Sequence, residues 1–412
     1  GRNDWDSRLA FSDYKSFFYP SIGLSAILTS MFNAPDWLTY LKVRGSYTEV
    51  GNSYGRFMTT VTYPYDEQTQ SWTSTSSYPN TKLKPERTKS WEVGLDARIL
   101  NDISLNLTYY RSNTYNQTFY ADLSLSSGYS NIPIQSGNIM NEGLEMSLGY
   151  NKQWKDFSFN TNYTLTWNKN RVKRLADGVY NYATGQPIQM PELSPLTYGH
   201  TDARLILRVG GSMGDVYGQR LLKRDLNGYI LNEEGVGLAM ENKETYLGSI
   251  LPKMNMGWSL GFGYKGVNLG MTFTGRFGGI VISETQSVLD AAGVSKVSAD
   301  VRDAGGVQIN QSKVSAQTYY QTIQGTAAYY TYSATNVRLG ELSLSYTLPK
   351  KWFDNKVGMT VGLVGKNLWM IYCKAPFDPE LTTSAASNFY QGFDAYMLPS
   401  TRNFGFNVKF QF

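Results

Sequence analysis

The stretch FSFNTNYTLTWN, residues 157–168, decides the fold. Its apolar residues, among them Phe157, Phe159 and Leu165, alternate with small polar residues such as Ser158 and Asn160. Successive side chains of a β-strand point to opposite faces of the sheet. The stretch therefore predicts a strand with one apolar face and one hydrophilic face.

The same period of two recurs along the chain. Further alternating runs occupy residues 91–99, 103–110, 258–264, 267–273, 342–348 and 404–412. No comparable run has apolar residues at the i, i+3, i+4, i+7 spacing of an amphipathic helix. The sequence predicts an all-β chain.

Strand length distinguishes a membrane barrel from a sandwich. Ordinary strands average about five or six residues, whereas a tilted strand needs about 9–11 residues to cross a bilayer. Because the second face carries mostly Ser, Thr, Asn, Gln and Gly, it suits a water-filled lumen. The long runs are 88–100, 103–112, 137–151, 157–169, 253–264, 267–278, 335–348, 356–369 and 400–412.

The connectors alternate between short and long, as the turns and loops of an outer-membrane barrel do. Adding runs at 1–10, 17–31 and 37–50, and weaker ones near 201–210 and 216–230, gives fourteen antiparallel strands. Aromatic residues cluster at strand ends, as in the girdles of a membrane barrel; the alternative is the aromatic core of a β-sandwich. Short connectors are 101–102, 152–156, 265–266 and 349–355, and long ones are 52–87, 113–136, 170–200, 279–334 and 370–399.

Composition excludes several other classes. With 38 Lys+Arg against 33 Asp+Glu, the net charge is +5, and no basic block of the kind that binds nucleic acid is present. One cysteine, Cys373, and one histidine, His200, leave no disulfide framework and no multi-histidine metal centre. The sequence contains no stretch of 18 apolar residues, so it predicts no membrane-spanning helix. No catalytic motif is found, so we expect neither catalytic residues nor a cofactor or metal.

Several segments resemble one known family in its own order along the chain. The segments are RNDW (2–5), FFYPS (17–21), WLTYLKVRGSY (37–47), VGN (50–52), LKPERTKSWEVG (83–94), NEGLE (141–145), VRLGE (337–341), YTLP (346–349), KAPFDPE (374–380) and LPSTR (398–402). They resemble the SusC/RagA family of TonB-dependent outer-membrane transporters of Bacteroidetes, which implies an outer-membrane location in a Gram-negative bacterium.

The resemblance implies that residues 1–412 are the C-terminal part of the barrel, about 14 strands of a 22-stranded barrel. The plug and the TonB box of the family are not found in the chain, and no signal peptide is found either. An open sheet edge in lipid leaves backbone groups unpaired, so we expect the N-terminal plug and barrel portion to complete the structure.

The resemblance also implies an active nutrient importer. A SusD-like surface lipoprotein would form its lid, and TonB–ExbB–ExbD would act through the missing part. Oligosaccharides and oligopeptides are equally compatible ligands. The alternatives are a passive porin-type diffusion channel, a soluble β-rich adhesin and, less compatible with the motifs, an outer-membrane enzyme.

Two sets of residues are candidate sites. The C-terminal run resembles the signal read by the barrel-assembly machinery, although a plain edge strand would have the same pattern; it consists of Phe404, Phe406, Val408, Phe410 and Phe412. Aromatic residues of the long connectors could stack on a ligand or pack loop against loop. They are Tyr54, Trp72, Tyr78, Tyr180, Tyr182, Tyr329, Tyr330, Phe389 and Tyr390. Asp378 is expected to cap a turn, with a calcium role beside Glu380 as the weaker alternative.

Overall fold

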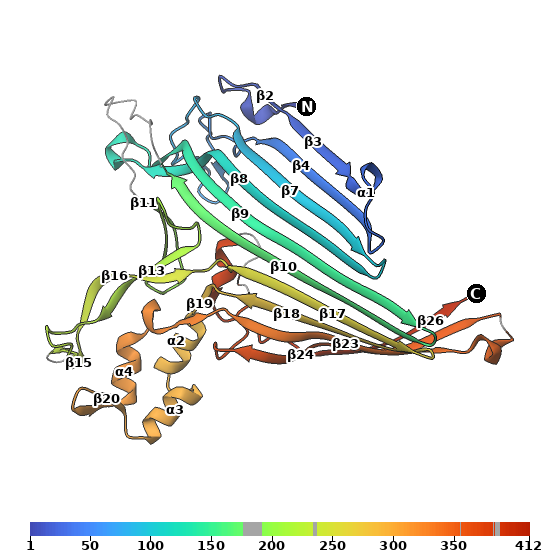
Figure 1. Cartoon of the computed structure of the whole chain (residues 1–412). Coiled ribbons are helices and arrows are strands. Elements are labelled where there is room, and N and C mark those ends of the chain that lie inside the picture. The colour runs from blue at the N-terminus through green and yellow to red at the C-terminus, as the bar shows by residue number, and fades with distance from the viewer. Residues whose placement is uncertain (176–191, 234–236, 355, 382, 384–387) are drawn as a thin grey trace. The chain divides into compact units, whose positions relative to one another are not determined.

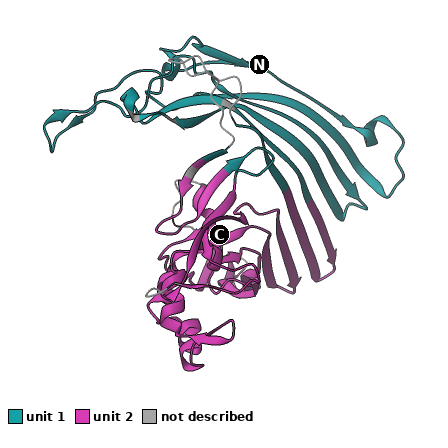
Figure 2. Cartoon of the chain, turned by 90° about the vertical axis from the view of Figure 1, so that its left-hand side faces the viewer, with its two compact units in different colours: residues 1–146, 168–193, 207–213 teal, residues 147–167, 194–206, 214–412 magenta. Residues whose placement is uncertain are grey.

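The computed structural model describes residues 1–412 except 176–191, 234–236, 355, 382 and 384–387 (Figure 1). The chain divides into two compact units (Figure 2). The first unit comprises residues 1–146, 168–193 and 207–213, and the second comprises residues 147–167, 194–206 and 214–412.

Antiparallel strands joined to their sequence neighbours form the sheet of the first unit. Val43 of β4 pairs with Leu95 of β7, which pairs in turn with Leu107 of β8. Asn101, in the short connector between β7 and β8, has a left-handed backbone with φ of 60°. Its strands are, in hydrogen-bonded order, β3 (Ser21–Ile27), β4 (Leu38–Asn52), β7 (Glu86–Ile99), β8 (Ile103–Asp122) and β9 (Asn131–Trp154).

The second unit contains the second half of the strand order. Its turn between β17 and β18 is Lys265-Gly266, and both residues have positive φ. A side chain at Gly266 would place a Cβ 2.7 Å from the carbonyl oxygen of Thr347, so this turn requires glycine. The strands are β10 (Phe157–Arg174), β17 (Met254–Tyr264), β18 (Val267–Phe277), β23 (Asn336–Leu348), β24 (Gly358–Cys373) and β26 (Asn403–Gln411).

Strands β9 and β10 each run through both units, and the hydrogen-bonded order continues along them. Within the described residues this sheet has eleven strands, where the sequence predicted fourteen. The predicted run at 1–10 contains β1 (Arg2–Trp5), and among the described strands β1 pairs only with β2 (Ser16–Tyr19). The runs near 201–210 and 216–230 contain β12 (Arg204–Arg208) and β13 (Asp215–Leu222), which belong to another sheet.

That second sheet has the order β11 (Glu192–Thr197), β12, β13 and β16 (Met240–Ser249). Leu205 and Ile206 are adjacent, so they face opposite ways, yet both are buried. A strand buried on both faces packs inside a protein and lacks the one apolar face of a membrane strand. This is the physical reason why these strands do not join the larger sheet.

The long connector between β18 and β23 contains helices that the sequence analysis did not predict. They are α2 (Glu284–Ala291), α3 (Lys296–Asp303) and α4 (Ala316–Ile323) (Figure 1). Each begins after a serine, Ser283, Ser295 or Ser315, whose hydroxyl accepts a hydrogen bond from a backbone N–H three residues further on. This is the preferred N-cap. No helix in the described part of the chain is long and apolar enough to cross a membrane.

The remaining elements are short. In the second unit β19 (Ile280–Ser283) pairs with β22 (Thr331–Ser333) and lies parallel to β25 (Phe393–Asp394), so segments about 110 residues apart meet. The others are α1 (Leu28–Met31), β5 (Tyr65–Asp66), β6 (Ser71–Trp72), β14 (Asn232–Glu233), β15 (Gly237–Leu238), β20 (Val307–Ile309), β21 (Ser312–Val314), and the 3-10 turns at Ser7–Leu9, Leu125–Ser127, Ala327–Tyr329, Lys350–Phe353 and Asn388–Gly392.

Candidate functional site

The sheet of the second unit has a continuous apolar face. Leu344 pairs with Leu363, which pairs with Phe406, and these side chains are 48%, 64% and 80% exposed. Nothing in the described chain covers them, so this face is available to lipid. Strand register extends the row across six strands as Phe159, Phe262, Leu269, Leu344, Leu363 and Phe406.

One residue further along each strand, the opposite face is small and polar. The corresponding row is Ser158, Gly263, Asn268, Ser345, Gly362 and Asn407. A Cβ at Gly263 would lie 2.3 Å from the hydroxyl of Ser158, because the serine side chain lies across the glycine. The two-faced strands predicted from the alternation are therefore observed.

Aromatic residues lie on the apolar face toward the long-connector ends of the strands. In the first unit Trp91 and Tyr109 are in ring contact at 5.4 Å, and in the second unit Trp258 and Phe273 are at 5.8 Å. Beyond Trp91, at the next position on the same face of β7, Lys89 forms an ion pair with Glu49 at 3.4 Å. The order from apolar residues through aromatic residues to charges is that of a membrane boundary.

The C-terminal strand presents the predicted assembly signal on this face. Phe404, Phe406 and Phe410 are 78%, 80% and 54% exposed. Within the described residues β26 pairs only with β24, so it is an edge strand of the sheet. An exposed apolar edge suits pairing with further strands. Recognition of this strand by the barrel-assembly machinery stays a prediction, and this includes the parts assigned to Val408 and Phe412.

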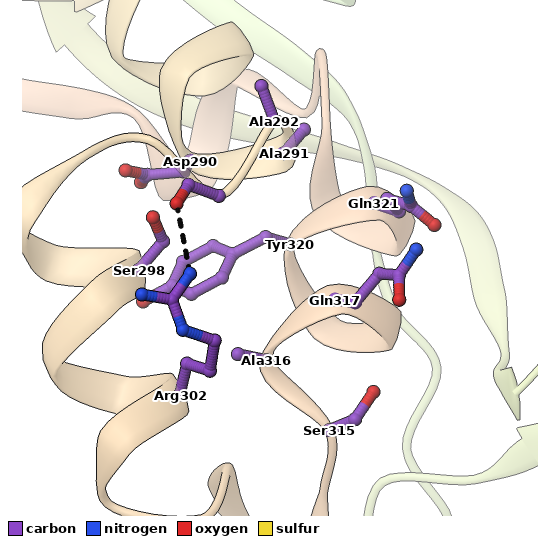
Figure 3. A pocket seen from close by; sticks show the side chains of 11 residues that line it. Asp290, Ala291, Ala292, Ser298, Arg302, Ser315, Ala316, Gln317, Tyr320 and Gln321 are labelled. Carbon is purple, nitrogen blue, oxygen red and sulfur yellow. Dashed lines mark hydrogen bonds between the residues drawn. The ribbon is translucent and has the colours of Figure 1, made fainter.

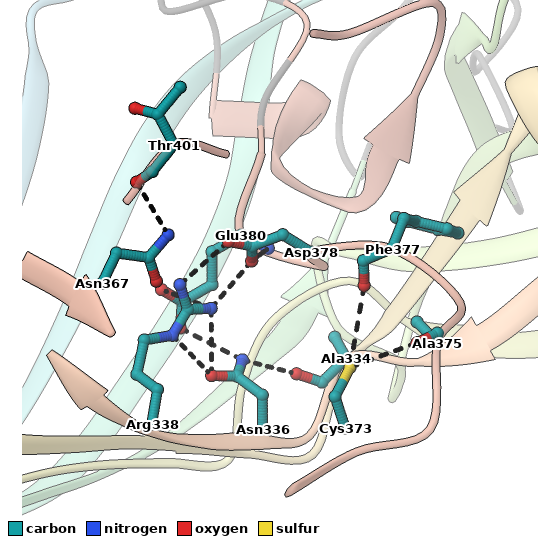
Figure 4. Close-up of polar contacts among 10 residues, drawn as sticks. All are labelled: Ala334, Asn336, Arg338, Asn367, Cys373, Ala375, Phe377, Asp378, Glu380 and Thr401. Carbon is teal, nitrogen blue, oxygen red and sulfur yellow. Dashed lines mark hydrogen bonds and ion pairs between the residues drawn. The ribbon is translucent and has the colours of Figure 1, made fainter. Parts of the chain in front are cut away.

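A buried ion pair connects two of the segments that resemble the family in sequence, VRLGE (337–341) and KAPFDPE (374–380). Arg338 of β23 donates to both carboxylate oxygens of Asp378, at 2.9 and 2.7 Å, and the two side chains are only 10% and 7% exposed (Figure 4). Asn336 accepts from the Arg338 guanidinium and donates to Glu380 at 3.1 Å. We call Asn336, Arg338, Asp378 and Glu380 the latch, since together they hold segment 374–380 to the start of β23.

The latch fixes the protonation state of its carboxylate. Burial alone would raise the pKa of Asp378, but hydrogen bonds from Arg338 and from the Glu380 backbone N–H lower this pKa below its usual value. The Cys373 thiol, at the end of β24, donates to the carbonyl oxygens of Ala375 and Phe377 (Figure 4). Asp378 thus serves the ion pair and a turn, and both of its oxygens are already used by Arg338.

The single histidine, His200, has a buried partner. Its Nδ1 lies 2.9 Å from Oε1 of Glu284, although the imidazole is 93% exposed. Glu284 also accepts from the hydroxyl of Tyr396 at 3.3 Å, and Ser283 donates to Asp394 at 2.6 Å. These contacts hold the start of α2 between residues 198–202 and 393–396.

Of the aromatic residues predicted to contact a ligand, the structure leaves some exposed and buries others. Trp72 is 70% exposed beside Tyr65, and Tyr78 is 40% exposed in edge contact with Tyr129. Both can present a ring to a ligand. Tyr180 and Tyr182 lie outside the described residues.

The other aromatics pack inside the loops. Tyr54 and Tyr330 are 3% and 2% exposed and belong to hydrophobic clusters, so the loop-packing alternative describes their positions in this structure. Burial, and then the nearby Asp290 carboxylate, raise the pKa of Tyr330, which keeps it neutral. Tyr329 accepts from the backbone N–H of Leu222. Phe389 and Tyr390 pack on the cluster around Tyr198, whose hydroxyl donates to the Phe389 carbonyl.

Comparison with known proteins agrees with this geometry. The family model of the TonB-dependent receptor-like β-barrel matches residues 1–368. TonB-dependent receptor P3 of Formosa agariphila is 25% identical over 99% of this chain and 43% of its own length. SusC of Bacteroides thetaiotaomicron is 27% identical over 37% of this chain and 14% of its own length.

A solved structure of the RagAB peptide importer in its closed-closed state is similar in fold, with a TM-score of 0.71 at 19% identity over 99% of this chain and 44% of that chain. The chain thus spans less than half the length of these relatives. The resemblance found in the sequence motifs is confirmed. The chain belongs to the TonB-dependent receptor β-barrel family, and its place is the outer membrane of a Gram-negative bacterium.

Proposed function

We propose that this chain is the barrel portion of an active importer of oligosaccharides or oligopeptides. A plug segment outside residues 1–412 would close the pore, and TonB–ExbB–ExbD would act on that plug. A SusD-like lipoprotein would form the lid. The barrel portion itself would form the wall and the loops and would carry out no chemistry.

The observation that carries the proposal is the paired rows of the second unit. One row is apolar across six strands and is exposed at Leu344, Leu363 and Phe406, and the next is made of Ser, Asn and Gly. A wall with lipid on one side and water on the other needs this arrangement. A soluble adhesin would have to cover Phe406 and Leu363, and the described chain does not.

The sheet edges support a partner segment. Within the described residues β3 and β26 are the two ends of the strand order. Unpaired backbone N–H and C=O groups in hydrocarbon each cost several kcal/mol, on the order of the penalties measured for buried polar groups. We therefore infer that strands outside residues 1–412 pair with both edges and close the barrel.

Ligand contacts are proposed for Trp72 and Tyr78, since their rings are exposed in the long connector between β4 and β7. An exposed ring offers a large rigid surface at low entropic cost. Replacing both with alanine should weaken ligand capture. Leu226, which is fully exposed outside the aromatic set, offers a matched control as Leu226→Ala.

The test is uptake by cells that produce the complete transporter. Mixed radiolabelled oligosaccharides and oligopeptides are offered to cells with and without functional TonB. Uptake that disappears without TonB supports the proposal. Uptake that persists without TonB, together with a steady open conductance in planar bilayers, supports the porin alternative and overturns the proposal.

The partner proposal is tested separately. The transporter is purified in mild detergent from outer membranes, and co-purifying chains are identified by mass spectrometry. A lipoprotein of the SusD type present in equal amount supports the lid. Its absence from preparations that retain TonB-dependent uptake overturns the lid and leaves the importer itself standing.

A further inference from the structure

Two hollows of similar volume in the second unit have walls of different chemistry. The first, of about 480 Å³, lies among helices α2, α3 and α4 and carries a carboxylate and a guanidinium, those of Asp290 and Arg302 (Figure 3). The second, of about 490 Å³, is a groove on the apolar face of the sheet, and no charged residue lines it. A wall with both charges suits many ligands, whereas an uncharged apolar wall favours an apolar chain.

The groove runs across strands β18, β23, β24 and β26. One row of its lining is Leu344, Leu363 and Phe406, the exposed row described above. The next row toward the short turns pairs Tyr346 with Val361. The lining residues between the two rows have their side chains on the other face of the sheet, so their backbone forms the floor of the groove. The groove therefore opens toward lipid.

The groove lies near the short-turn ends of its strands. Val267, which lines it, is two residues after Lys265, and Tyr346 is four residues before Lys350. At about 3.3 Å per residue, the groove lies roughly 7 to 13 Å from these lysines along the strands, within one half of a hydrocarbon core of about 30 Å. Short turns of outer-membrane barrels face the periplasm. The groove is therefore at the depth of acyl chains in the periplasmic leaflet.

Lysine is concentrated in the short turns of the second unit. Residues 155–156, 265–266 and 349–357 contain five lysines and two aspartates, which gives a net charge of +3. In the first unit the connectors on the short-turn side, 28–37 and 100–102, contain two aspartates and no basic residue, which gives −2. The positive charge therefore gathers at the strands of the second unit, where the groove lies.

The turn 349–357 presents most of this charge. Lys350, Lys351 and Lys356 are exposed, and none of them forms an ion pair with another described residue. The stem of Lys350 lies beside the start of β24, because a Cβ at Gly358 would be 3.5 Å from its Cε. Trp352 of the same turn is 61% exposed, and tryptophan rings prefer the level of the lipid headgroups. The turn thus presents ammonium groups and an amphipathic ring at that level.

We propose that the groove and the turn 349–357 together bind one anionic phospholipid of the periplasmic leaflet. An acyl chain fills the groove, and the phosphate pairs with Lys350, Lys351 and Lys356, as clusters of basic residues beside membrane segments do with anionic lipids. A zwitterionic phospholipid suits the site less, because the lysines repel its own cation. The site rests on the outer-membrane location and does not depend on uptake.

A second copy of the chain is a poorer occupant of the groove. In a twofold interface the same surface of both copies meets. The lysine turn of one copy would then approach the lysine turn of the other, and like charges oppose such contact. An anionic lipid satisfies both the apolar groove and the positive turn.

The test titrates the delipidated complete transporter with dioleoylphosphatidylglycerol and with dioleoylphosphatidylcholine. Native mass spectrometry gives the affinity for the first bound lipid. The acyl chains of the two probes are identical, so only the headgroups differ. Lys350→Gln/Lys351→Gln/Lys356→Gln removes three exposed ammonium groups, and heat-modifiable gel migration checks that the barrel still folds. The same three changes to arginine keep the charge.

Two further variants separate the groove from the overall charge. Val361→Phe fills the groove with a larger apolar side chain and leaves the lysines in place. The matched charge control removes three exposed lysines outside the short turns and changes the net charge equally. It is Lys223→Gln/Lys243→Gln/Lys296→Gln.

Phosphatidylglycerol should bind about tenfold or more tightly than phosphatidylcholine, since each basic residue near an anionic headgroup strengthens the attraction several-fold. The triple glutamine variant should lose this preference, and the arginine variant and the charge control should keep it. Val361→Phe should weaken binding of phosphatidylglycerol.

Equal affinity of the wild type for the two lipids overturns the proposal, because the groove then holds ordinary boundary lipid. A preference that survives the triple glutamine variant, or that the charge control also loses, overturns the role of the turn. Unchanged binding by Val361→Phe overturns the role of the groove. A dimer that Val361→Phe separates assigns the groove to a second copy instead. Uptake is not measured, so this inference and the importer function fail independently.

Discussion

The two units use an arginine–aspartate pair in opposite ways. In the first unit Arg44 and Asp96 lie 3.9 Å apart on the polar face of the sheet and are 39% and 27% exposed. In the second unit Arg338 and Asp378 make two hydrogen bonds of 2.7 and 2.9 Å and are 10% and 7% exposed. The first pair lies on the polar face of the sheet, and the second holds segment 374–380 to the start of β23.

The surroundings of the pairs explain the contrast. Asp96 is shared by Lys42 and Arg44 across the strands, and a Cβ at Gly94 would come within 2.5 Å of Arg44 Nε. The polar wall of the second unit has Ser, Asn and Gly at most corresponding positions, and an ion pair stands on it where Glu341 of β23 faces Lys366 of β24 at 3.6 Å. The alternation of residues along a strand thus determines which face is polar. The neighbours on adjacent strands determine whether a charged side chain can be accommodated on that face.

The largest expected effect is at the latch. Asp378→Ala leaves Arg338 buried without its bidentate partner, a loss that costs about 3–5 kcal/mol when a buried pair is broken. Hydrogen exchange of the amides in 374–381 should accelerate accordingly, while exchange in β17 stays slow. Replacing both partners, as Arg338→Met/Asp378→Leu, should restore much of the protection. Unchanged hydrogen exchange in Asp378→Ala would show that the Arg338–Asp378 pair does not stabilise segment 374–381.

A second prediction sharpens the comparison between the two faces of the sheet. Leu95→Arg puts a charge on the apolar face, which costs about 2–4 kcal/mol near the bilayer midplane. Asn106→Arg, on the polar face of the adjacent strand β8 and opposite Asp96 at nearly the same depth, should cost far less. The measurement is urea unfolding in lipid vesicles, followed by heat-modifiable gel migration. Equal losses for both variants would contradict the assignment of the two faces.

A smaller effect is expected on the polar face of the first unit. Asp96→Ala removes a half-exposed pair, so the loss of stability should be about 1 kcal/mol or less. Screening should shrink this loss further as salt is raised from roughly 0.05 to 0.5 M. The same unfolding assay at both salt concentrations checks it, with Asn268→Ala, an uncharged residue on the polar wall of the second unit, as the control. A loss as large as that of Asp378→Ala would erase the contrast between the units.

The strands were predictable because their signal is local. The alternation over 157–168 and the turns at 101–102 and 265–266 are observed where the sequence predicted them. Helices α2 to α4 were missed, since each has only eight residues and is largely polar. The serine N-caps at 283, 295 and 315 were the available signal.

The sites depended on long-range packing and were less predictable. Arg338 and Asp378 both lie in motifs noted in the sequence, but they are 40 residues apart, and only the path of β23, β24 and the following segment brings them together. Likewise, nothing local distinguishes Tyr330, which is buried, from Trp72, which is exposed. Burial depends on which loops meet, and the alternation of a strand carries no information about that.

Acidification tests the latch without a mutation and should have the smallest effect near neutrality. The folded state lowers the pKa of Asp378, so the stabilisation is fully present above the ordinary carboxyl pKa of about 4 and is lost as the pH falls through the lowered value. Exchange of 374–381, corrected for its intrinsic pH dependence, should stay constant from about pH 8 to 5 and rise below about pH 4. Asp378→Asn, which has no carboxyl group to titrate there, should lack this rise. A rise already present above pH 5 would mean that another group controls the segment, because a carboxyl stabilised in its charged form cannot release it in that range.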